Sequence, residues 1–268
     1  MHKSKIIDCI TFFDNNFMFE LRYNILKDYV DNFVICESKF DHRGFQKPKN
    51  FIWKNSFDEK QIKYFFLEKP FPKNNDPWKN QAIQREFLLK CTNFADENDY
   101  IFFSDPDEIP DPNLLINFKL EKKYGIFFQD CFNYKFNLFN PYETPWEGTR
   151  VAKKKDLTSI DFMRQKIKSK NIKKFYRPDI EKNIQIFKNA GWHFNNIMKP
   201  SQISLKLKTF AHKEFSGSRF TDVKVIGEKI KKKKDLFERG HVYKKISLTN
   251  KFPKFLLNNK KKFKKFIM

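Results

Sequence analysis

Glycine is scarce in this sequence, with 7 residues among 268, whereas phenylalanine occurs 34 times. Scarce glycine argues against a glycine-rich phosphate-binding loop, and the aromatic content argues against disorder over most of the chain. The 4 cysteines are widely spaced and form no CxxC pair, which argues against a zinc site and favours buried thiols. No stretch approaches about 18 uninterrupted apolar residues, so no membrane-spanning helix is expected.

The N-terminal residues lack the apolar core and small-residue cleavage site of a signal peptide. We therefore expect a protein of the cytoplasm, at most peripheral to the inner face of a membrane. Basic residues outnumber acidic ones by 54 to 32, a formal net charge of +22, which indicates an anionic partner. The alternative is compositional drift, because an AT-rich genome enriches every protein in Lys, Asn, Phe and Ile.

The first hundred residues read as a doubly wound α/β unit. Residues 6–13 and 32–38 are short apolar runs, and apolar residues at helical spacing lie between them. Strand, helix and strand within about 35 residues predict a βαβ unit and hence a parallel sheet. Residues 64–67 and 100–104 are further strand candidates, while the aromatic segments after Pro112 suit a mixed or antiparallel extension.

A helix is predicted from about Pro77, because Asp76 suits the N-cap and proline suits the first helical position. Its apolar residues are expected to face the core, with the polar ones off that face. The predicted core-facing residues are Ile83, Phe87, Leu88 and Cys91. The residues predicted to lie off the core face are Asn80, Gln84 and Arg85.

The stretch "YIFFSDPDEIPDP" places acid directly after an apolar strand. Ligands of open α/β sheets gather beyond the carboxyl ends of strands. Asp105 and Asp107, one residue apart, present oxygens to one hard cation, and Mg²⁺ or Mn²⁺ would then neutralise a leaving diphosphate. The alternative is an ordinary solvated turn with capping carboxylates. A third acid, Glu108, and the surrounding prolines favour the cation.

Three blocks carry a family resemblance: "FFDNNFMFELRYNILKDYVDNFVICESKFDHRGFQKP", "FSDPDEIP" and "AGWHF". In this order they resemble glycosyltransferase family 17, the family of the β-1,4-N-acetylglucosaminyltransferase that adds bisecting GlcNAc, over roughly residues 6–240. The resemblance implies a GT-A fold, a Rossmann-like mixed sheet flanked by helices in a single domain. Residues 1–112 would form the nucleotide-sugar half and 113–240 the acceptor half, with a basic tail at 241–268.

The resemblance also implies an inverting enzyme that moves a sugar, GlcNAc in the family, from a UDP-sugar to a glycan hydroxyl with β-linkage. Asp105 and Asp107 become the pair that holds Mn²⁺, or Mg²⁺, against the UDP diphosphate. Phe13 and Asp14 become candidates for the uridine pocket, and Glu37 lies near the ribose. The partners are thus a UDP-sugar and a glycan acceptor.

Two further residues are candidates in this setting. Arg85 could form a bidentate contact with the diphosphate, and the alternative is a surface helix arginine paired with Glu86 or a neighbouring acid. His193 is a candidate metal ligand, because GT-A enzymes often place a late histidine on the metal. The alternative for His193 is a packed, hydrogen-bonded histidine beside Trp192.

Inversion needs a general base for the acceptor hydroxyl, and the candidates are Glu214 and Glu108. A cation beside Glu108 would lower its pKa, which favours a donor-sugar contact there and the base role for Glu214. The alternative for Glu214 is a solvated partner of Lys213 or His212.

Aromatic and basic residues elsewhere are candidates for sugar and donor contacts. Trp146, with Gly148 and Arg150, could form a wall for a sugar, and Trp192 could equally do so. Each of these is also a candidate for the aromatic core. The residues that could shape the donor loop are His42, Arg43 and Lys47.

Two lysine clusters, 229–234 and the tail, stand apart from this site. In the tail, Lys alternates with Phe and Ile, which suits peripheral contact with an anionic membrane, and the alternative is a frayed terminus. No nucleic-acid-binding motif is present, so we expect no nucleic acid partner. Rival functions are a non-catalytic polyanion-binding module on the same fold and a metal-dependent nuclease.

Overall fold

The computed structural model describes residues 3–209 and 213–268. Its first half contains the predicted βαβ unit, and the helix that follows begins at the predicted residue, where the Asp76 side chain accepts a hydrogen bond from Trp78 N. The elements of this half are β1 (Ile6–Phe12), α1 (Asn16–Leu26), β2 (Asn32–Ser38), β3 (Ile62–Leu67), α2 (Pro77–Lys90) and β4 (Tyr100–Ser104).

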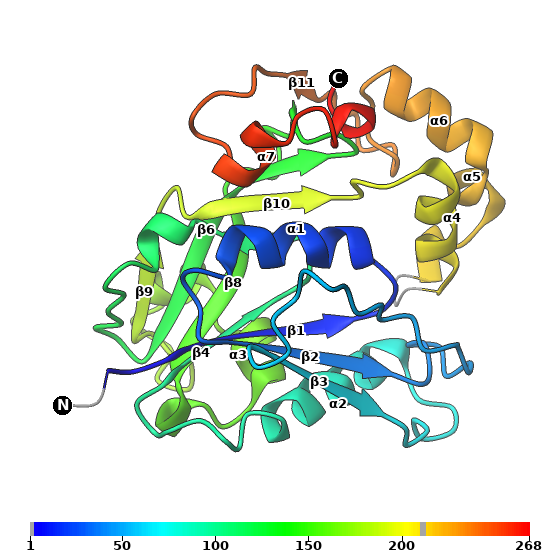
Figure 1. Ribbon diagram of the computed structural model, residues 1–268. Coiled ribbons are helices and arrows are strands. Elements are labelled where there is room, and N and C mark those ends of the chain that lie inside the picture. The colour runs from blue at the N-terminus through cyan, green and yellow to red at the C-terminus, as the bar shows by residue number, and fades with distance from the viewer. Residues whose placement is uncertain (1–2, 210–212) are drawn as a thin grey trace.

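The four strands form a parallel sheet in the order β3-β2-β1-β4. Because side chains alternate along a strand, Ile6 and Ile10 of β1 pack on the side of α1, while Ile7 and Cys9 join Leu88 of α2 on the other. Helices therefore cover both faces, as the continuously apolar strands predict. Figure 1 shows α1 above these strands and α2 below them, and the fold class is confirmed as α/β with a mixed sheet.

The second half extends the sheet with antiparallel strands. β8 pairs antiparallel with both β4 and β6, and the sheet order continues β4-β8-β6-β7-β11. The strands of this half are β5 (Glu108–Pro110), β6 (Tyr124–Asn133), β7 (Leu138–Phe139), β8 (Trp146–Lys153), β9 (Ile184–Phe187), β10 (Gly191–Asn195) and β11 (Lys244–Lys245). The α-helices of this half are α3 (Ile160–Lys166), α4 (Pro200–Thr209), α5 (Ser218–Thr221), α6 (Val223–Lys231) and α7 (Lys254–Asn258). Short 3-10 turns form at η1 (Pro112–Leu114), η2 (Lys154–Asp156), η3 (Ser169–Lys173), η4 (Lys213–Phe215) and η5 (Lys264–Phe266).

The aromatic run that ends in "GWHF" forms two strands, β9 and β10, and both pair parallel with β6. The backbone takes positive φ at Asn189, between the two strands, and at Gly191, the first residue of β10, where φ is +130°. A side chain at Gly191 would place its Cβ 2.2 Å from the carbonyl oxygen of Ile109, so only glycine fits there. This close approach lets β10 lie beside β5, where the acidic stretch continues.

Helix α2 turns a polar face inward, so the predicted orientation of Asn80, Gln84 and Arg85 off the core is wrong. All three are buried, whereas Ile83 and Phe87 are only half-buried. The polar groups are tolerated there because they have partners. For example, Gln84 Nε2 donates to the carbonyl of Cys36 at 3.0 Å and Asn80 Nδ2 donates to the carbonyl of His42 at 2.9 Å.

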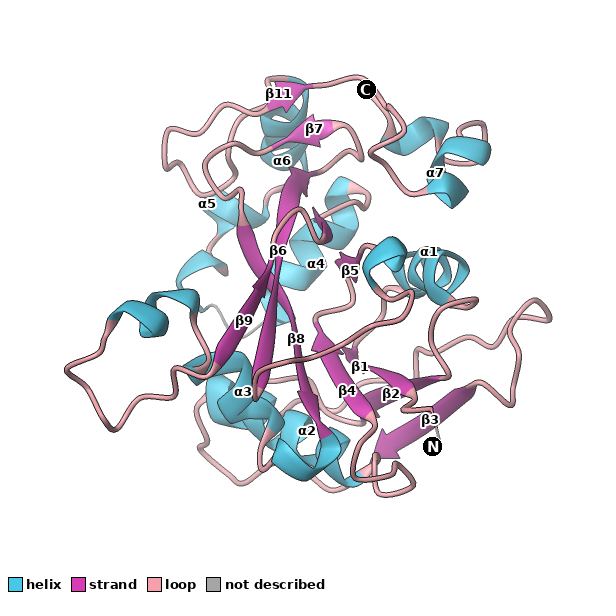
Figure 2. Cartoon of the chain, turned by 90° about the vertical axis from the view of Figure 1, so that its left-hand side faces the viewer, coloured by secondary structure: helices cyan, strands magenta, loops and turns pink. Residues whose placement is uncertain are grey.

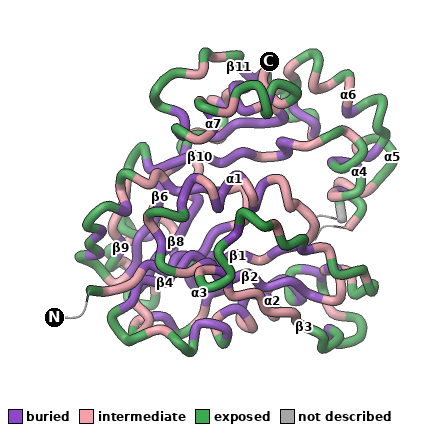
Figure 3. The backbone as a smooth tube through the Cα atoms, in the orientation of Figure 1, coloured by how far each residue is buried: buried purple, intermediate pink, exposed green. Residues whose placement is uncertain are grey.

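Apolar residues of the predicted basic tail, residues 241–268, complete the core beside α1, which excludes the alternative of a frayed terminus. Figure 3 shows the central strands buried and the exposed residues gathered along the outer loops, and in Figure 1 the C-terminal segment lies at the top of the molecule, near α7. Phe252, Leu256 and Phe263 are at most 4% exposed and belong to the same hydrophobic cluster as α1. The lysines point outward because the apolar side chains between them point inward. In the described part of the chain no helix is both long and apolar enough to cross a bilayer.

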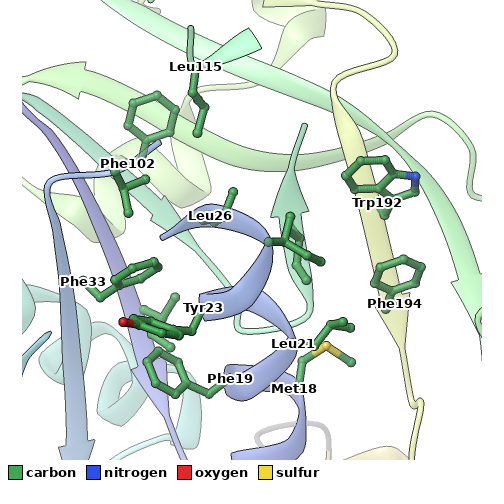
Figure 4. Packing of buried hydrophobic residues seen from close by; sticks show 14 of the residues in the cluster. Met18, Phe19, Leu21, Tyr23, Leu26, Phe33, Phe102, Leu115, Trp192 and Phe194 are labelled. Atoms are coloured by element: carbon green, nitrogen blue, oxygen red, sulfur yellow. The ribbon is translucent and has the colours of Figure 1, made fainter. Parts of the chain in front are cut away.

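Figure 4 shows how α1 is enclosed, with Phe33 of β2 on one side and Trp192 and Phe194 of β10 on the other. The Phe263 ring closes this cluster from the C-terminal end, with its centroid 5.8 Å from that of Phe17 and 5.5 Å from that of Phe136. The two halves of the chain are thus joined by one aromatic core.

Truncating Phe263 is expected to cost much of the stability. We expect Phe263→Ala to lower the free energy of unfolding by about 3–5 kcal/mol, because it removes a ring that is 2% exposed and leaves a cavity. Phe175→Ala is the matched control, because that ring is 86% exposed and its loss should change stability by less than about 0.5 kcal/mol. Urea denaturation measures both, and equal losses would contradict the packed position of the C-terminal segment.

Candidate functional site

The carboxyl ends of β1, β2 and β4 meet at one edge of the sheet, on the side of α4 in Figure 1. The chain adds β2 and β3 on one side of β1 and then β4 on the other, so the strand order reverses between β1 and β4. Ligands of open α/β sheets bind at such a reversal. Asp14 follows β1 and Asp105 follows β4, which places both at this edge.

The acidic turn after β4 is fixed by a short strand that the sequence did not predict. β5 pairs antiparallel with β10, so that Glu108 lies opposite His193. On the two sides of the turn, Phe194 N donates to Asp107 O at 2.8 Å and Asp105 N donates to Glu108 Oε2 at 3.1 Å. These bonds bring His193, from the far half of the chain, to the acidic turn.

Asp105 is held by two arginines from different helices. Arg164 of α3 donates from Nη2 to Asp105 Oδ2 at 2.7 Å, and Arg85 Nη2 lies 3.9 Å from Asp105 Oδ1. Burial opposes the charge of Asp105, but the two guanidinium groups outweigh burial and lower the pKa of this carboxyl to about 2. The carboxylate is therefore ionised at physiological pH and already paired within the protein.

Asp107 faces a different set of groups. Its Oδ1 lies 3.7 Å from His193 Nε2, and its Oδ2 lies 3.8 Å from Lys206 Nζ. The His193 ring is stacked on Trp146, with the ring centroids 4.6 Å apart, so its orientation is fixed by packing. Asp107 and His193 thus present an oxygen and a nitrogen to each other without a direct hydrogen bond.

Glu108 is fully buried and engaged on both carboxylate oxygens. Oε1 accepts from Trp146 Nε1 and from Arg164 Nη2, each at 2.6 Å, and Oε2 accepts from Asp105 N. Its carbonyl oxygen also accepts from Arg22 Nη1 at 2.6 Å. A carboxylate held in this way is poorly placed to reach an acceptor hydroxyl. These contacts favour a role for Glu108 in positioning Arg164 and Trp146. They do not favour its predicted roles as the base or as a contact of the donor sugar.

Arg85 lies at the site, but as a buried residue. Its side chain is 3% exposed and Nη1 donates to Asp161 Oδ1 at 2.9 Å. Glu86, the alternative partner, instead accepts from Ser159 Oγ and Asp161 N at the start of α3. The helices α2 and α3 are therefore tied together beside Asp105.

On the β2 side of the edge, Glu37 is fully buried and organises the loop that follows the strand. It accepts hydrogen bonds from Lys47 Nζ at 2.5 Å, Asn50 N at 2.7 Å, Phe51 N at 3.0 Å and Tyr64 Oη at 2.8 Å. These contacts occupy both of its oxygens, so any contribution to a ribose site is through the position of the loop.

Phe13 and Asp14 lie at the end of β1, beside the same loop. Lys47 Nζ is 5.4 Å from the centroid of the Phe13 ring. Burial raises the pKa of Asp14, although the positive charges of Lys206 and Lys47 oppose this shift. Since Lys206 acts on Asp14 and also lies near Asp107, α4 carries a cation between the β1 and β4 sides of the edge. Two of the donor-loop candidates contact the helices beside the site. His42 Nε2 lies 2.9 Å from Gln84 Oε1 of α2, and Arg43 Nη2 lies 3.4 Å from the carbonyl oxygen of Leu207 in α4.

With this geometry in view, the sequence matches the model of glycosyltransferase family 17 over residues 1–139. The chain belongs to glycosyltransferase family 17. The matched range contains Asp105, Asp107 and Glu108 but ends well before residue 240, the expected limit of the resemblance. Family membership makes the protein a glycosyltransferase, while Arg164, His193 and the other partners from the second half come from outside the matched range.

Comparison with curated proteins gave no match. Solved structures with weak similarity include HddC from Yersinia pseudotuberculosis, at 10% identity over 69% of this chain and 91% of that one, with a TM-score of 0.37. Another is a glycosyltransferase involved in glycosylation of the major capsid of PBCV-1, at 10% identity over 69% and 81%, with a TM-score of 0.35. Likenesses this weak say nothing about the substrate of the family 17 protein.

Of the predicted sugar-wall residues, Trp146 joins the site and two others do not. Arg150 is fully buried, and its guanidinium donates to the carbonyl oxygens of Glu147, Gly148 and Ile167. Trp192 is 6% exposed, and its Nε1 donates to Lys251 O at 3.1 Å. Both residues hold the family 17 fold together from inside and are not positioned to face a sugar.

Glu214, the other base candidate, lies on η4 just after α4 and is exposed. His212, one of its two alternative partners, lies outside the described residues. The structure places η4, which carries Glu214, against α4, the helix that carries Lys206. The role of Glu214 as a base stays a prediction.

The predicted metal pair is divided in this structure. Among the described residues, no group of three His, Cys, Asp or Glu side chains is arranged to hold a cation. Asp105 is neutralised by Arg164, whereas Asp107 and His193 are the two groups with ligand atoms facing each other. These two residues fit a cation that takes few protein ligands and completes its shell with substrate oxygens and water.

Sequence reasoning missed Arg164 and Lys206. Arg164 lies on a helix of only seven residues with Ser159 as its N-cap. So short a helix gives a weak sequence signal, which the neighbouring aromatic segments make harder to recognise. Lys206 is one of 54 basic residues, so nothing in the sequence separates it from the lysines on the surface. Only the pairing of β5 with β10 and the packing of α3 and α4 bring these cations to the carboxylates.

Proposed function

We propose that this family 17 enzyme transfers a sugar from a UDP-sugar to a hydroxyl of a glycan acceptor, with inversion and formation of a β-linkage. UDP-GlcNAc is the first donor to test, because the family resemblance implies it. One observation carries the proposal: Asp107 and His193 face each other at the strand-order reversal, with Lys206 3.8 Å from the same carboxylate. A site of this charge pattern suits a diphosphate and a divalent cation.

Asp107 Oδ1 and His193 Nε2 are the protein atoms best placed to hold Mn²⁺ or Mg²⁺. Hard cations of this kind are often bound through one or two protein ligands together with substrate phosphates. When bound, the cation would neutralise charge on the departing UDP. This assignment revises the predicted Asp105 and Asp107 pair, because Asp105 is committed to Arg164 at 2.7 Å.

Arg164, Arg85 and Lys206 supply the positive charge around the turn. Asp105 and Glu108 fix Arg164 in one orientation, and Asp161 fixes Arg85, so neither guanidinium has to be ordered when a substrate binds. Preorganised charge of this kind stabilises charge that develops on a leaving group. Lys206 is the most exposed of the three, with 31% of its side chain accessible, and it is suited to contact the donor directly.

Calorimetric titration with UDP, in the presence and in the absence of Mn²⁺, tests the proposal. We expect Mn²⁺ to tighten UDP binding by about ten-fold or more, because a cation adds contacts to both phosphates. Hydrolysis of a panel of UDP-sugars then identifies the donor. Binding of UDP that is indifferent to the cation would exclude the metal site, and absence of UDP binding together with salt-sensitive polyanion binding would favour the non-catalytic module.

A further inference from the structure

A basic segment projects from the enzyme between α3 and β9. We call residues 166–183 the basic excursion; seven of them are Lys or Arg and two are acidic. In Figure 2 the loop that leads into β9 extends away from the body of the molecule. Its base is well anchored: Ile167 is fully buried, and Asn171 Nδ2 donates to Lys166 O at 2.7 Å. The excursion is thus a projection whose base is anchored in the core.

The middle of the basic excursion carries apolar side chains in solvent. Phe175 is 86% exposed, more than any other large hydrophobic residue in the described ranges, and the adjacent Tyr176 is 67% exposed. The two rings contact each other edge to face, with centroids 5.7 Å apart, and Ile172 nearby is 40% exposed. Adjacent exposed aromatic residues on an anchored projection are typical of a contact surface.

Lysines lie close to these rings in the sequence. Lys166, Lys170 and Lys173 are exposed, and Lys174 immediately precedes Phe175. Arg177 pairs with Asp179 at 2.6 Å, which leaves the lysines as the charges available to a partner. Aromatic side chains flanked by lysines match the boundary of a bilayer, where rings enter the headgroup layer and ammonium groups meet lipid phosphates.

We propose that the basic excursion docks the enzyme on the surface of an anionic lipid bilayer, with Phe175 and Tyr176 entering the headgroup layer. A bilayer fits better than a linear polyanion because two adjacent rings, 86% and 67% exposed, lie together on a projecting segment. A nucleic acid or polysaccharide would instead be expected to follow an extended cationic groove.

The C-terminal lysine cluster provides the internal contrast. There Phe263 is 2% exposed and packs on Phe17 and Phe136, so this segment offers charge without apolar side chains that could enter a bilayer. The membrane contact predicted for the basic tail is therefore reassigned to the excursion.

The excursion begins close to the acidic turn, so docking would determine how this turn is oriented relative to the bilayer. The excursion continues directly from α3, and Arg164 of that helix donates to Asp105 Oδ2 at 2.7 Å. A docked enzyme would therefore hold the Asp105 side of the site near the bilayer, where a lipid-linked glycan presents its hydroxyls. This orientation rests on the proposed function, whereas docking itself does not.

Vesicle sedimentation tests the docking. The full chain is mixed with phosphatidylcholine vesicles and with vesicles that also contain phosphatidylglycerol, and the bound fraction is measured. We expect binding to the anionic vesicles only, and we expect Phe175→Ser with Tyr176→Ser to weaken it by about ten-fold. Lys170→Glu with Lys173→Glu should weaken it comparably and remove most of its salt dependence. Ile52→Ser, which changes a side chain 59% exposed elsewhere, is the matched control and should bind as the unaltered chain does.

Three outcomes would overturn the proposal. Unchanged vesicle binding after the double aromatic substitution would remove the excursion from the contact. Loss of binding only in Lys260→Glu with Lys261→Glu would assign it to the C-terminal cluster. Binding to heparin that depends on the same rings and exceeds binding to vesicles would show a polyanion site. UDP calorimetry on the same variants separates the two proposals, because variants with weakened docking should bind UDP normally. Vesicle binding by a chain that does not bind UDP would contradict the proposed function and leave the docking proposal intact.

Discussion

Asp107→Ala is expected to lower sugar transfer by about a thousand-fold, because a divalent cation supplies several kcal/mol of charge stabilisation to a leaving diphosphate. Asp107 Oδ1 lies 3.7 Å from His193 Nε2, and Asp105, the other carboxylate of the predicted pair, is committed to Arg164. The same variant should lose the Mn²⁺-dependent part of UDP binding in calorimetry. Its stability should change by less than about 1 kcal/mol, since little apolar surface is lost.

The matched control is Asp28→Ala, a surface carboxylate at the end of α1 that is exposed. It should leave both UDP binding and transfer unchanged. If Asp107→Ala keeps its response to Mn²⁺, the cation is held elsewhere. If it unfolds at the temperature of the assay, the acidic turn is a structural feature, which urea denaturation would show independently of activity.

Arg164→Met should destabilise the fold and disable the site together. Arg164 Nη2 lies 2.7 Å from Asp105 and 2.6 Å from Glu108, and Nη1 donates to Gly148 O at 2.9 Å. Removing the cation leaves the fully buried Glu108 without an ion-pair partner and leaves Asp105 with Arg85 alone, 3.9 Å away, and breaking a buried pair costs about 3–5 kcal/mol. Denaturation in urea at neutral pH measures this loss. Arg164→Lys should recover only part of it, because an ammonium group cannot make these three contacts at once.

Acid titration gives this prediction a second readout. The pKa of Asp105 in the folded protein, about 2, lies below its ordinary value of 3.8, so folding favours the charged form. The stability that this carboxylate contributes is present above about pH 4 and is lost as the pH falls toward 2. In Arg164→Met the contribution should be greatly reduced in that window. The control is Arg219→Gln, which alters a surface pair with Glu238 and should cost less than about 1 kcal/mol.

The central strands and the acidic turn could be predicted because short-range signals determine them. β4 is continuously apolar and is followed at once by Asp105, Asp107 and Glu108, and the start of α2 is marked by Asp76 and Pro77. Local periodicity and capping act within a few residues, so one sequence suffices to find such elements.

The partners of the carboxylates could not be predicted because long-range packing selects them. Arg164 is distant in sequence from Asp105, and the inward polar face of α2 contradicts its own apolar pattern. That face is stable only because Asn80, Gln84 and Arg85 find partners on other segments. Likewise, the sequence did not identify Phe263 as a core residue, because the many lysines around it are typical of an exposed segment.

The packing of the C-terminal segment affects how the protein is made. Strands β6 and β10 and helix α1 are synthesised well before Phe252, Leu256 and Phe263, which complete their cluster. At translation rates of about 5–20 residues per second, the nascent chain carries this uncovered aromatic surface for roughly 4–15 seconds after β10 is made. During that interval it is a substrate for chaperones, and a product truncated before Phe252 would keep this surface exposed and become a target for proteolysis.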